Sequence, residues 1–222
     1  MIRGVDVSSY QSETFPLEID GLPVEFAIIK VTQGTGYVNP RWRGQLAWAR
    51  KNGLAVGFYH FGEAGYAAGQ VAHFAANVEP QLQAGDTLWY DWESANGSAP
   101  TNAEKDSWIR SAQERFVGHR VGLYCNVHFW KNVDTTSFAG DALWIAQYGV
   151  PVGQPGIEHP WTIHQYSDVG IDHNVARFAS KAELLLWAGV PGKPEQQAST
   201  VMEAVMRMDA KLDAILRKLG AA

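Results

Sequence analysis

The sequence predicts an α/β fold: an irregular parallel (β/α) barrel of the TIM-like kind, followed by a C-terminal amphipathic helix. Short apolar segments alternate with helical patterns over about 190 residues. Some of these segments, such as Phe26–Ile29 and Val56–Tyr59, are apolar on both faces, as parallel strands covered by helices are. Polar residues also gather at the C-terminal ends of the segments, where a β/α barrel assembles its active site.

Seven strands are expected from runs of β-branched and aromatic residues. They cover Arg3–Val7, Phe26–Thr32, Leu54–Phe61, Thr87–Trp92, Arg120–Cys125, Ala142–Tyr148 and Trp161–Tyr166. Helical patterns lie near Trp42–Asn52, Gly69–Leu82, Ala103–Phe116 and Ser180–Trp187. Because helices after some strands look short or missing, the barrel is expected to be irregular. No Gly-x-Gly-x-x-Gly motif follows the first strand, which disfavours a dinucleotide-binding sheet.

The C-terminal part of the sequence reads as a separate element. We expect the barrel over residues 1–190, a Gly- and Pro-rich linker over 191–197 and a helix over 198–222. Apolar residues in the helix follow a heptad spacing, namely Ala198, Val201, Val205, Met208, Leu212, Ile215 and Leu219. Such a seam suits a partner helix and predicts a homo-oligomer. Docking of the stripe on the chain's own barrel stays open.

Composition limits the classes of function. Hydrophobic residues make up 46% of the 222 residues, enough to bury a core, and no stretch is long and apolar enough to span a membrane. The net charge of −5 argues against a nucleic-acid partner, which needs a basic face. The single cysteine, Cys125, allows no intramolecular disulfide and reads as a small buried hydrophobe.

The sharpest local motif is the acidic pair in Leu88–Glu93. Asp91 and Glu93 stand two residues apart on a strand, so their side chains point to one face. Two close carboxyls push each other's pKa values apart, so that one holds a proton while the other stays ionised. Glycoside cleavage needs this division of labour. The motif is short, and a solvated strand end or helix N-cap would look the same.

Two further aspartates strengthen the glycosidase interpretation. Asp6 ends the first strand, and Asp172 follows the last one. Either could be a turn-former. In a closed barrel, however, the first and last strands are neighbours, so both side chains would reach the same mouth as Asp91 and Glu93. Four acidic groups converging among aromatic residues indicate a catalytic site.

Seven segments in order resemble the glycoside hydrolase family 25 lysozymes, which are muramidases. The matching segments are Gly4–Gln11, Phe26–Gly34, Gly57–Phe61, Trp89–Glu93, Leu143–Tyr148, Gln165–Ser167 and Ile171–Asn174. The resemblance spans residues 4–174 and implies an irregular β/α barrel. It also implies cleavage of the β-1,4 bond between N-acetylmuramic acid and N-acetylglucosamine in bacterial peptidoglycan, with retention and without a cofactor or metal.

The resemblance also implies roles for individual residues. Glu93 would be the general acid, Asp91 would stabilise the intermediate, and Asp6 and Asp172 would complete an acidic floor. Whether the nucleophile is a carboxylate or the substrate's own 2-acetamido oxygen stays open. The remaining substrate-binding residues would be Tyr59, Tyr124, Tyr148 and Gln165.

Three places depart from the family pattern. Gln33 stands where the family usually has Glu, so a charge is expected to be lost there. His164 replaces a Trp that often precedes Gln-Tyr in the family. The stretch between Ser167 and Asp172 is short, which affects the reach of Asp172.

Two other functions remain as alternatives. One is a non-catalytic glycan-binding module on the same barrel, although the costly acidic pair has no use in a pure binder. The other is a metal-dependent deacetylase that uses His60 and His164 with the aspartates. The sequence from Met1 shows no signal peptide, so we expect a phage lysin made in the host cytoplasm and released to the cell wall.

Overall fold

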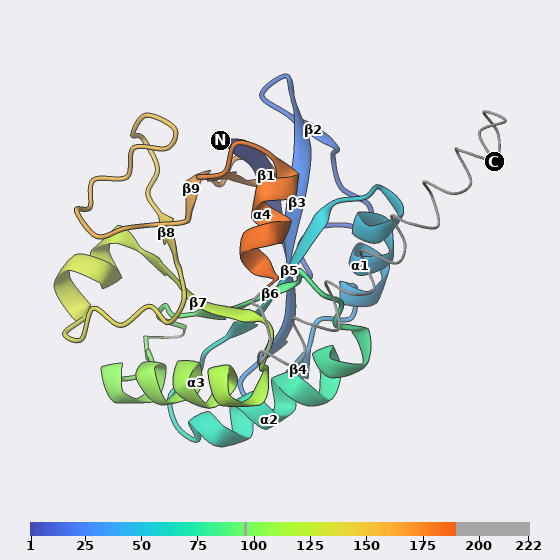
Figure 1. Cartoon of the computed structure of the whole chain (residues 1–222). Helices are drawn as coiled ribbons and strands as arrows, with labels where there is room; N and C mark the ends of the chain where they lie inside the picture. Colours follow the sequence, from blue (N-terminus) through green and yellow to red (C-terminus); the bar gives the residue numbers. More distant parts are fainter. Residues whose placement is uncertain (96, 190–222) are drawn as a thin grey trace, which may run out of the picture. The chain divides into compact units, whose positions relative to one another are not determined.

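The computed structural model describes residues 1–95 and 97–189, which form a closed eight-stranded barrel (Figure 1). Its strands are β1 (Ile2–Val7), β3 (Leu22–Gln33), β5 (Ala55–Phe61), β6 (Thr87–Asp91), β7 (Arg120–Asn126), β8 (Leu143–Ala146), β9 (Ile163–Ser167) and β10 (Asp172–Ala176). They run in the order β1-β10-β9-β8-β7-β6-β5-β3, and parallel pairing of β1 with β3 closes the ring.

The helices cover the outside of the barrel. They are α1 (Trp42–Lys51), α2 (Ala67–Val78), α3 (Asn102–Arg115) and α4 (Lys181–Ala188), with α2 and α3 lying side by side in Figure 1. Short elements complete the fold: β2 (Glu18–Ile19), β4 (Tyr37–Val38), the 3-10 turn Glu79–Gln81 and the π-helical turn Phe129–Val133. All seven predicted strands and four predicted helices are confirmed, with ends shifted by up to four residues.

The predicted irregularity is also confirmed. Only a π-helical turn follows β7, and no helix of the described residues lies between β8 and β9. The eighth strand, β10, was not among the seven predicted ones, and it pairs antiparallel with both β1 and β9. A parallel return needs a crossover of a dozen or more residues, whereas the few residues between Ser167 and Asp172 allow only a hairpin.

Two apolar layers hold the barrel together, one inside the ring and one between the ring and the helices. Successive residues of β3 alternate between them: Phe26 and Ile28 face inward, and Ala27 and Ile29 face outward. Helix α3 begins at a capping box formed by Thr101 and Glu104. The alternation decides which residues of each strand reach the mouth of the barrel.

Residues 1–189 form one compact unit. The predicted linker at 191–197 and the heptad helix at 198–222 lie outside the described residues, as does residue 190, at the end of the predicted barrel domain. Among the helices that the structure describes, none has the length and hydropathy needed to cross a membrane.

Candidate active site

All eight predicted site residues line one pocket of about 210 Å³ at the mouth of the barrel. They are Asp6, Asp91, Glu93, Asp172, Tyr59, Tyr124, Tyr148 and Gln165, and Trp144 joins them. Asp6 and Asp91 come from the C-terminal halves of parallel strands. Asp172 is the first residue of β10, and because β10 runs antiparallel, this first residue lies at the same edge.

Strand β6 sets the geometry of the acidic pair. Trp89 and Asp91 alternate with outward-facing Leu88 and Tyr90, so Asp91 points into the mouth. After the strand ends, the Trp92 amide still donates to the Tyr124 carbonyl oxygen at 2.9 Å, which continues the ladder by one residue. Glu93 therefore lies on the same side as Asp91, and their carboxyls are within hydrogen-bonding reach.

Burial favours the protonated form of this pair. Asp91 is 5% exposed. Its burial, together with the nearby charge of Glu93, raises the Asp91 pKa well above the usual value, and Lys30 lowers it in part. Burial also raises the pKa of Glu93, again against the effect of Lys30. Two such carboxyls in contact share one proton over a range of pH, which provides an acid and an anion side by side.

A second carboxyl pair, Asp6 and Asp172, lines the same pocket. Asp6 Oδ2 accepts hydrogen bonds from Gln165 Nε2 at 2.8 Å and from Asn174 Nδ2 at 2.7 Å. Burial and the charge of Asp172 raise the Asp6 pKa well above its usual value, while these two donors act to lower it. Asp172 is within hydrogen-bonding reach of Asp6 and is partly exposed, so its carboxyl borders the open pocket.

The tyrosines form a wall that one glutamine organises. The hydroxyls of Tyr124 and Tyr148 donate to the same acceptor, Gln165 Oε1, at 3.0 and 2.6 Å. The Tyr124 ring also packs against Trp144, with 4.5 Å between centroids. Tyr148 is 45% exposed, so its ring face is open to a sugar, whose C–H groups pack on aromatic rings.

Sequence reasoning gave no role to several residues that shape this site. Asn174 orients Asp6, and Trp144 supports the tyrosine wall. The signal for Asn174 was its spacing of two residues from Asp172, which places both on one face once Asp172–Ala176 is recognised as a strand. No local sequence pattern pointed to Glu63, whose carboxylate accepts from Gln33 at 2.8 Å. A carboxylate is therefore present next to Gln33, where the absence of the family's Glu predicted a lost charge.

The two histidines of the metal-dependent alternative do not face the aspartates. His60 lies outside the barrel ring, where Thr32 Oγ1 and Gln70 Oε1 contact its two nitrogens at 2.8 and 3.0 Å. The His164 nitrogens contact the Gly153 amide and the Gln147 carbonyl oxygen. Among residues 1–95 and 97–189, no three His, Cys, Asp or Glu side chains are grouped to hold a metal. This arrangement removes the ligand set on which that alternative depended.

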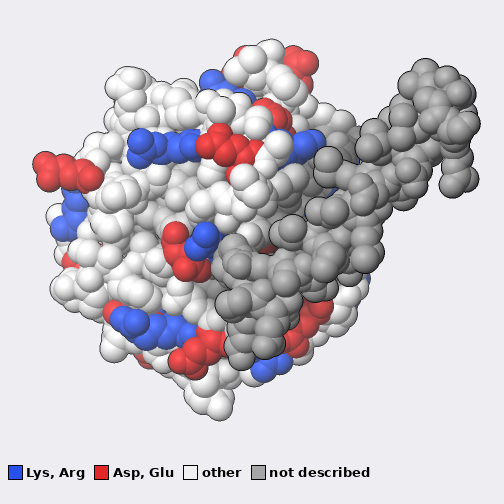
Figure 2. All heavy atoms as spheres, in the orientation of Figure 1, with Lys and Arg blue, Asp and Glu red and all other residues white. Residues whose placement is uncertain are grey.

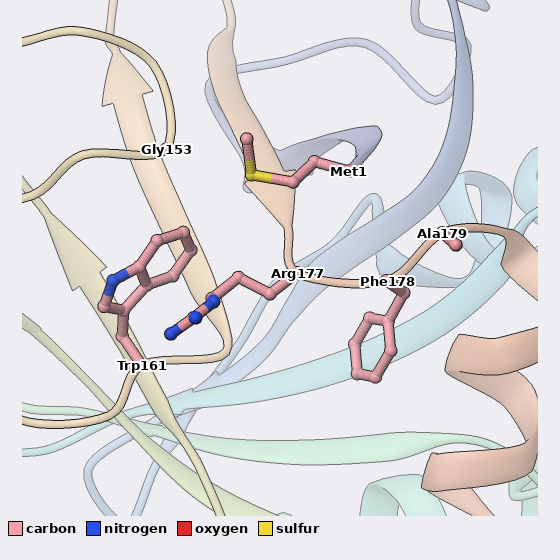
Figure 3. A pocket seen from close by; sticks show the side chains of 6 residues that line it. All are labelled: Met1, Gly153, Trp161, Arg177, Phe178 and Ala179. Carbon is pink, nitrogen blue, oxygen red and sulfur yellow. The ribbon is translucent and has the colours of Figure 1, made fainter.

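A larger hollow of about 500 Å³ lies at the other end of the barrel (Figure 3). It is lined by Met1 before β1, Trp161 before β9 and Arg177 after β10, with the guanidinium of Arg177 4.9 Å from the Trp161 ring centroid. These positions are the N-terminal ends of β1 and β9, opposite to the acidic mouth. The hollow is therefore separate from the carboxyl cluster.

Charge on the visible surface is mixed. On the face drawn in Figure 2, Lys and Arg side chains lie next to Asp and Glu rather than gathering into a patch of one sign. This pattern agrees with the modest net charge of −5.

The chain is similar to known proteins over most of the barrel. The family described as glycosyl hydrolases family 25 matches residues 5–175. An autolytic lysozyme of Clostridium acetobutylicum is 25% identical over 188 residues, covering 82% of this chain and 55% of that protein. Lysozyme M1 of Streptomyces globisporus is 29% identical over 189 residues, covering 76% of this chain and 63% of its own.

A phage protein and a solved structure extend the comparison. The lysozyme of Lactococcus phage mv1 is 28% identical over 182 residues, covering 72% of this chain and 87% of its own. The structure of a muramidase from Acremonium alcalophilum superposes with a TM-score of 0.70 at 25% identity, covering 85% of this chain and 99% of that one. The chain spans between half and two thirds of the length of the Clostridium and Streptomyces relatives.

Proposed function

The chain belongs to glycosyl hydrolases family 25, and from that premise we propose that it is a peptidoglycan hydrolase of the N-acetylmuramidase type. It cuts the β-1,4 bond between N-acetylmuramic acid and N-acetylglucosamine. The observation that carries the proposal is the buried carboxyl pair of Asp91 and Glu93, because glycoside cleavage requires one protonated and one ionised acid at the scissile bond.

Glu93 is the general acid. It is more exposed than Asp91, so its carboxyl can reach the oxygen that joins the two sugars. Its proton moves to that oxygen as the bond from C1 of the muramic acid breaks, and N-acetylglucosamine leaves as an alcohol. Burial favours this role because it raises the pKa of Glu93 towards the working pH.

Asp91 supplies the anion that opposes the positive charge developing at C1. The same carboxylate can hold the N–H of the 2-acetamido group, so that the acetamido oxygen attacks C1 from the other face. A close pair favours retention, since an inverting pair of acids stands about 6.5–9.5 Å apart to admit a water molecule. Water then attacks C1 and gives its proton to the Glu93 carboxylate, which restores the acid.

Asp6 and Asp172 form the far wall of the sugar site. Asp6 is held by Gln165 and Asn174 and is almost fully buried, so it shapes the field in the pocket rather than touching substrate. Asp172 borders the open pocket and can accept hydrogen bonds from sugar hydroxyls. Tyr59, Tyr124 and Tyr148 line the same space and offer ring faces to pyranose C–H groups.

Digestion of purified peptidoglycan by wild type and Glu93→Gln tests the proposal. Glu93→Gln retains the shape but has no proton to donate, so activity should fall by about 10²–10⁴-fold. Fragments with a reducing muramic acid end, released by wild type and lost in the variant, identify the bond and the acid. Binding to walls without release of fragments would instead support the glycan-binding module.

The partner of the site is the bacterial cell wall, and we further propose that the protein is a phage lysin. The similarity to the lysozyme of Lactococcus phage mv1 supports this assignment. Protein added to bacterial suspensions should lower their turbidity, and Glu93→Gln should not. An export signal encoded directly upstream of Met1 in the native gene would contradict the lysin assignment.

A further inference from the structure

Strand β3 contains a bulge beside the acidic pair. Lys30 pairs with Tyr59 of β5, and Thr32, two residues on, pairs with the adjacent His60, so Val31 is the extra residue. Val31 and Thr32 are both fully buried outside the ring, Thr32 against the His60 ring. In a regular strand Lys30 and Gln33 would point to opposite faces. Lys30 shares the inward face of Phe26 and Ile28, and the bulge brings Gln33 to that same face.

The Lys30 ammonium is bound there by a neutral group. Its Nζ donates to Gln33 Oε1 at 2.8 Å and lies 4.4 Å from the centroid of the Phe61 ring and 5.8 Å from that of Tyr37. Neither group in contact with it is a carboxylate, and among the described residues no acidic side chain lies within 4.0 Å of it. Lys30 is therefore held in place by a neutral partner, and its ammonium forms no close ion pair with a carboxylate of the described residues.

Glu63 fixes which way the Gln33 amide faces. Gln33 Nε2 donates to Glu63 Oε1 at 2.8 Å. Since a carboxylate only accepts and an ammonium only donates, the amide oxygen must face Lys30 and the amide nitrogen must face Glu63. Gly34, with φ +52°, leaves space for the Glu63 carboxylate that a side chain would fill.

The backbone at Glu63 is itself anchored. Gln70 of α2 accepts from the Glu63 amide at 3.0 Å and donates to the Glu63 carbonyl oxygen at 2.7 Å. Gln70 is 3% exposed and also contacts His60. Glu63, Gln33 and Lys30 thus form a hydrogen-bonded series. Its Glu63 end is anchored to the buried Gln70, and its Lys30 end lies beside the active site.

The charges around Lys30 are those of the active site. Asp91, Glu93 and Glu63 act on its ammonium. The pKa of Asp91 is shifted in turn by Glu93, Lys30 and Asp6. The pKa of Glu93 is shifted by Lys30, Asp91 and Asp172. Lys30 is the only cation in these sets, and it lowers the pKa of both carboxyls of the pair against their burial.

We infer that Gln33 and Glu63 are positioning residues, which hold Lys30 as an unpaired cation so that one of Asp91 and Glu93 stays ionised at the working pH. Without a nearby cation, the pKa values of the two buried carboxyls would be higher, so a smaller share of the pair would be ionised to face the developing charge at C1. The neutral amide matters because a carboxylate at position 33 would neutralise Lys30. This inference rests on the proposed muramidase activity. It adds that Gln33 and Glu63, through Lys30, set the ionisation of the Asp91 and Glu93 pair.

Gln33→Glu is the sharpest test, because it keeps the shape of residue 33 and leaves Lys30 in place, while it replaces the donor to Glu63 with a second carboxylate oxygen. The new carboxylate pairs with the ammonium, so the acid limb of the kcat/KM profile should move to higher pH by roughly half a unit, the shift that one partly screened charge produces. Lys30→Met, which keeps the length of the side chain over the Phe61 ring, should move the limb in the same direction.

Glu63→Gln should act in the opposite direction. It keeps an acceptor for Gln33 Nε2 but removes an anion that offsets Lys30, so the acid limb moves to lower pH, by less because Glu63 is exposed. Glu18→Gln is the matched control. Glu18 pairs with Pro23 at the start of β3, about 30 Å along the strand from Gln33, and should leave the profile unchanged.

A second readout separates this inference from the proposed function. Carbon NMR of the labelled side-chain carboxyls of Asp91 and Glu93 follows their titration without substrate. Opposite shifts in Gln33→Glu and Glu63→Gln support the chain of residues even if the wild type releases no wall fragments. Titration curves of both variants that coincide with wild type would overturn it, whatever their activity.

Discussion

Gln165 Nε2 donates to Asp6 Oδ2 at 2.8 Å, across 159 residues of sequence. The other end of the same amide accepts from Tyr124 and Tyr148. Because the tyrosine hydroxyls donate here and Asp6 accepts, the amide oxygen of Gln165 must face the tyrosines and the amide nitrogen must face Asp6. The Gln165 side chain, which is 3% exposed, thus connects Asp6 to both tyrosines.

Gln165→Glu should therefore be severe despite its equal size. It replaces one of the two donors to Asp6 Oδ2 with an oxygen, which leaves only Asn174 and places a third carboxyl against the buried Asp6, at a cost of about 1–3 kcal/mol. We expect a lower Tm and a fall in kcat/KM, measured by calorimetry and by wall digestion. Gln154→Glu, in an exposed loop, is the control. Equal Tm values for wild type and Gln165→Glu would show that the bond to Asp6 contributes nothing.

Asp91→Asn should abolish activity and yet stabilise the protein at neutral pH. The folded-state pKa of Asp91 is raised above the unfolded value of about 3.9. Its contribution is therefore fully favourable below about pH 3.9 and is lost as pH rises through the folded pKa. We expect the Tm of Asp91→Asn at pH 7 to exceed that of wild type by about 2–4 °C, the effect of 1 kcal/mol in a domain of this size.

The difference in Tm should shrink towards pH 4, where wild-type Asp91 is protonated as well. Thermal unfolding of both proteins between pH 4 and 8 measures it. Glu114→Gln removes an exposed carboxylate on α3 and should show no such trend. A constant gap between Asp91→Asn and wild type at all pH values would contradict the electrostatic explanation.

His60→Phe should reduce the acid sensitivity of the fold. Burial lowers the pKa of His60 to about 3, below the unfolded value of about 6.5. The stability that it contributes is present above about pH 6.5 and is lost as pH falls towards 3. The variant should be less stable at pH 7, because Gln70 and Thr32 lose a partner, but its Tm should fall less between pH 7 and 5. His128→Phe, at an exposed ring, is the control.

Removal of the N-acetyl group from muramic acid should distinguish the two nucleophiles. If the 2-acetamido oxygen attacks C1, deacetylated walls should be cut at least about 10²-fold more slowly, since an intramolecular nucleophile is worth far more than bulk water. The measurement is the initial rate of fragment release from matched walls. Equal rates, with a covalent sugar adduct seen by mass spectrometry, would favour a carboxylate nucleophile.

The heptad at residues 198–222 predicts self-association. Light scattering of the full chain and of a chain ending at residue 194 should give an oligomer and a monomer. A seam with a 3.5-residue period buries its apolar stripe best against a second helix. Masses that differ only by the deleted peptide would favour docking of the stripe on the chain's own barrel.

The sequence by itself predicted seven of the eight barrel strands, the four helices and the four acidic residues that line the pocket. The alternation of side chains along β6 puts Asp91 and Glu93 on one face, and closure of the ring brings Asp6 and Asp172 to the same edge. These predictions depend on the period of a single strand and on the order of strands, both of which are written in local patterns.

Tertiary structure alone decided the reversed direction of β10, the bulge at Val31 and the partners of Gln165 and Gln33. A bulge and a hydrogen bond depend on what the neighbouring strand presents, so residues 30 to 160 positions apart become partners only when the barrel closes. The bulge at Val31 also brings Gln33 to the same face as Lys30, because an extra residue in one strand changes which face every later side chain meets.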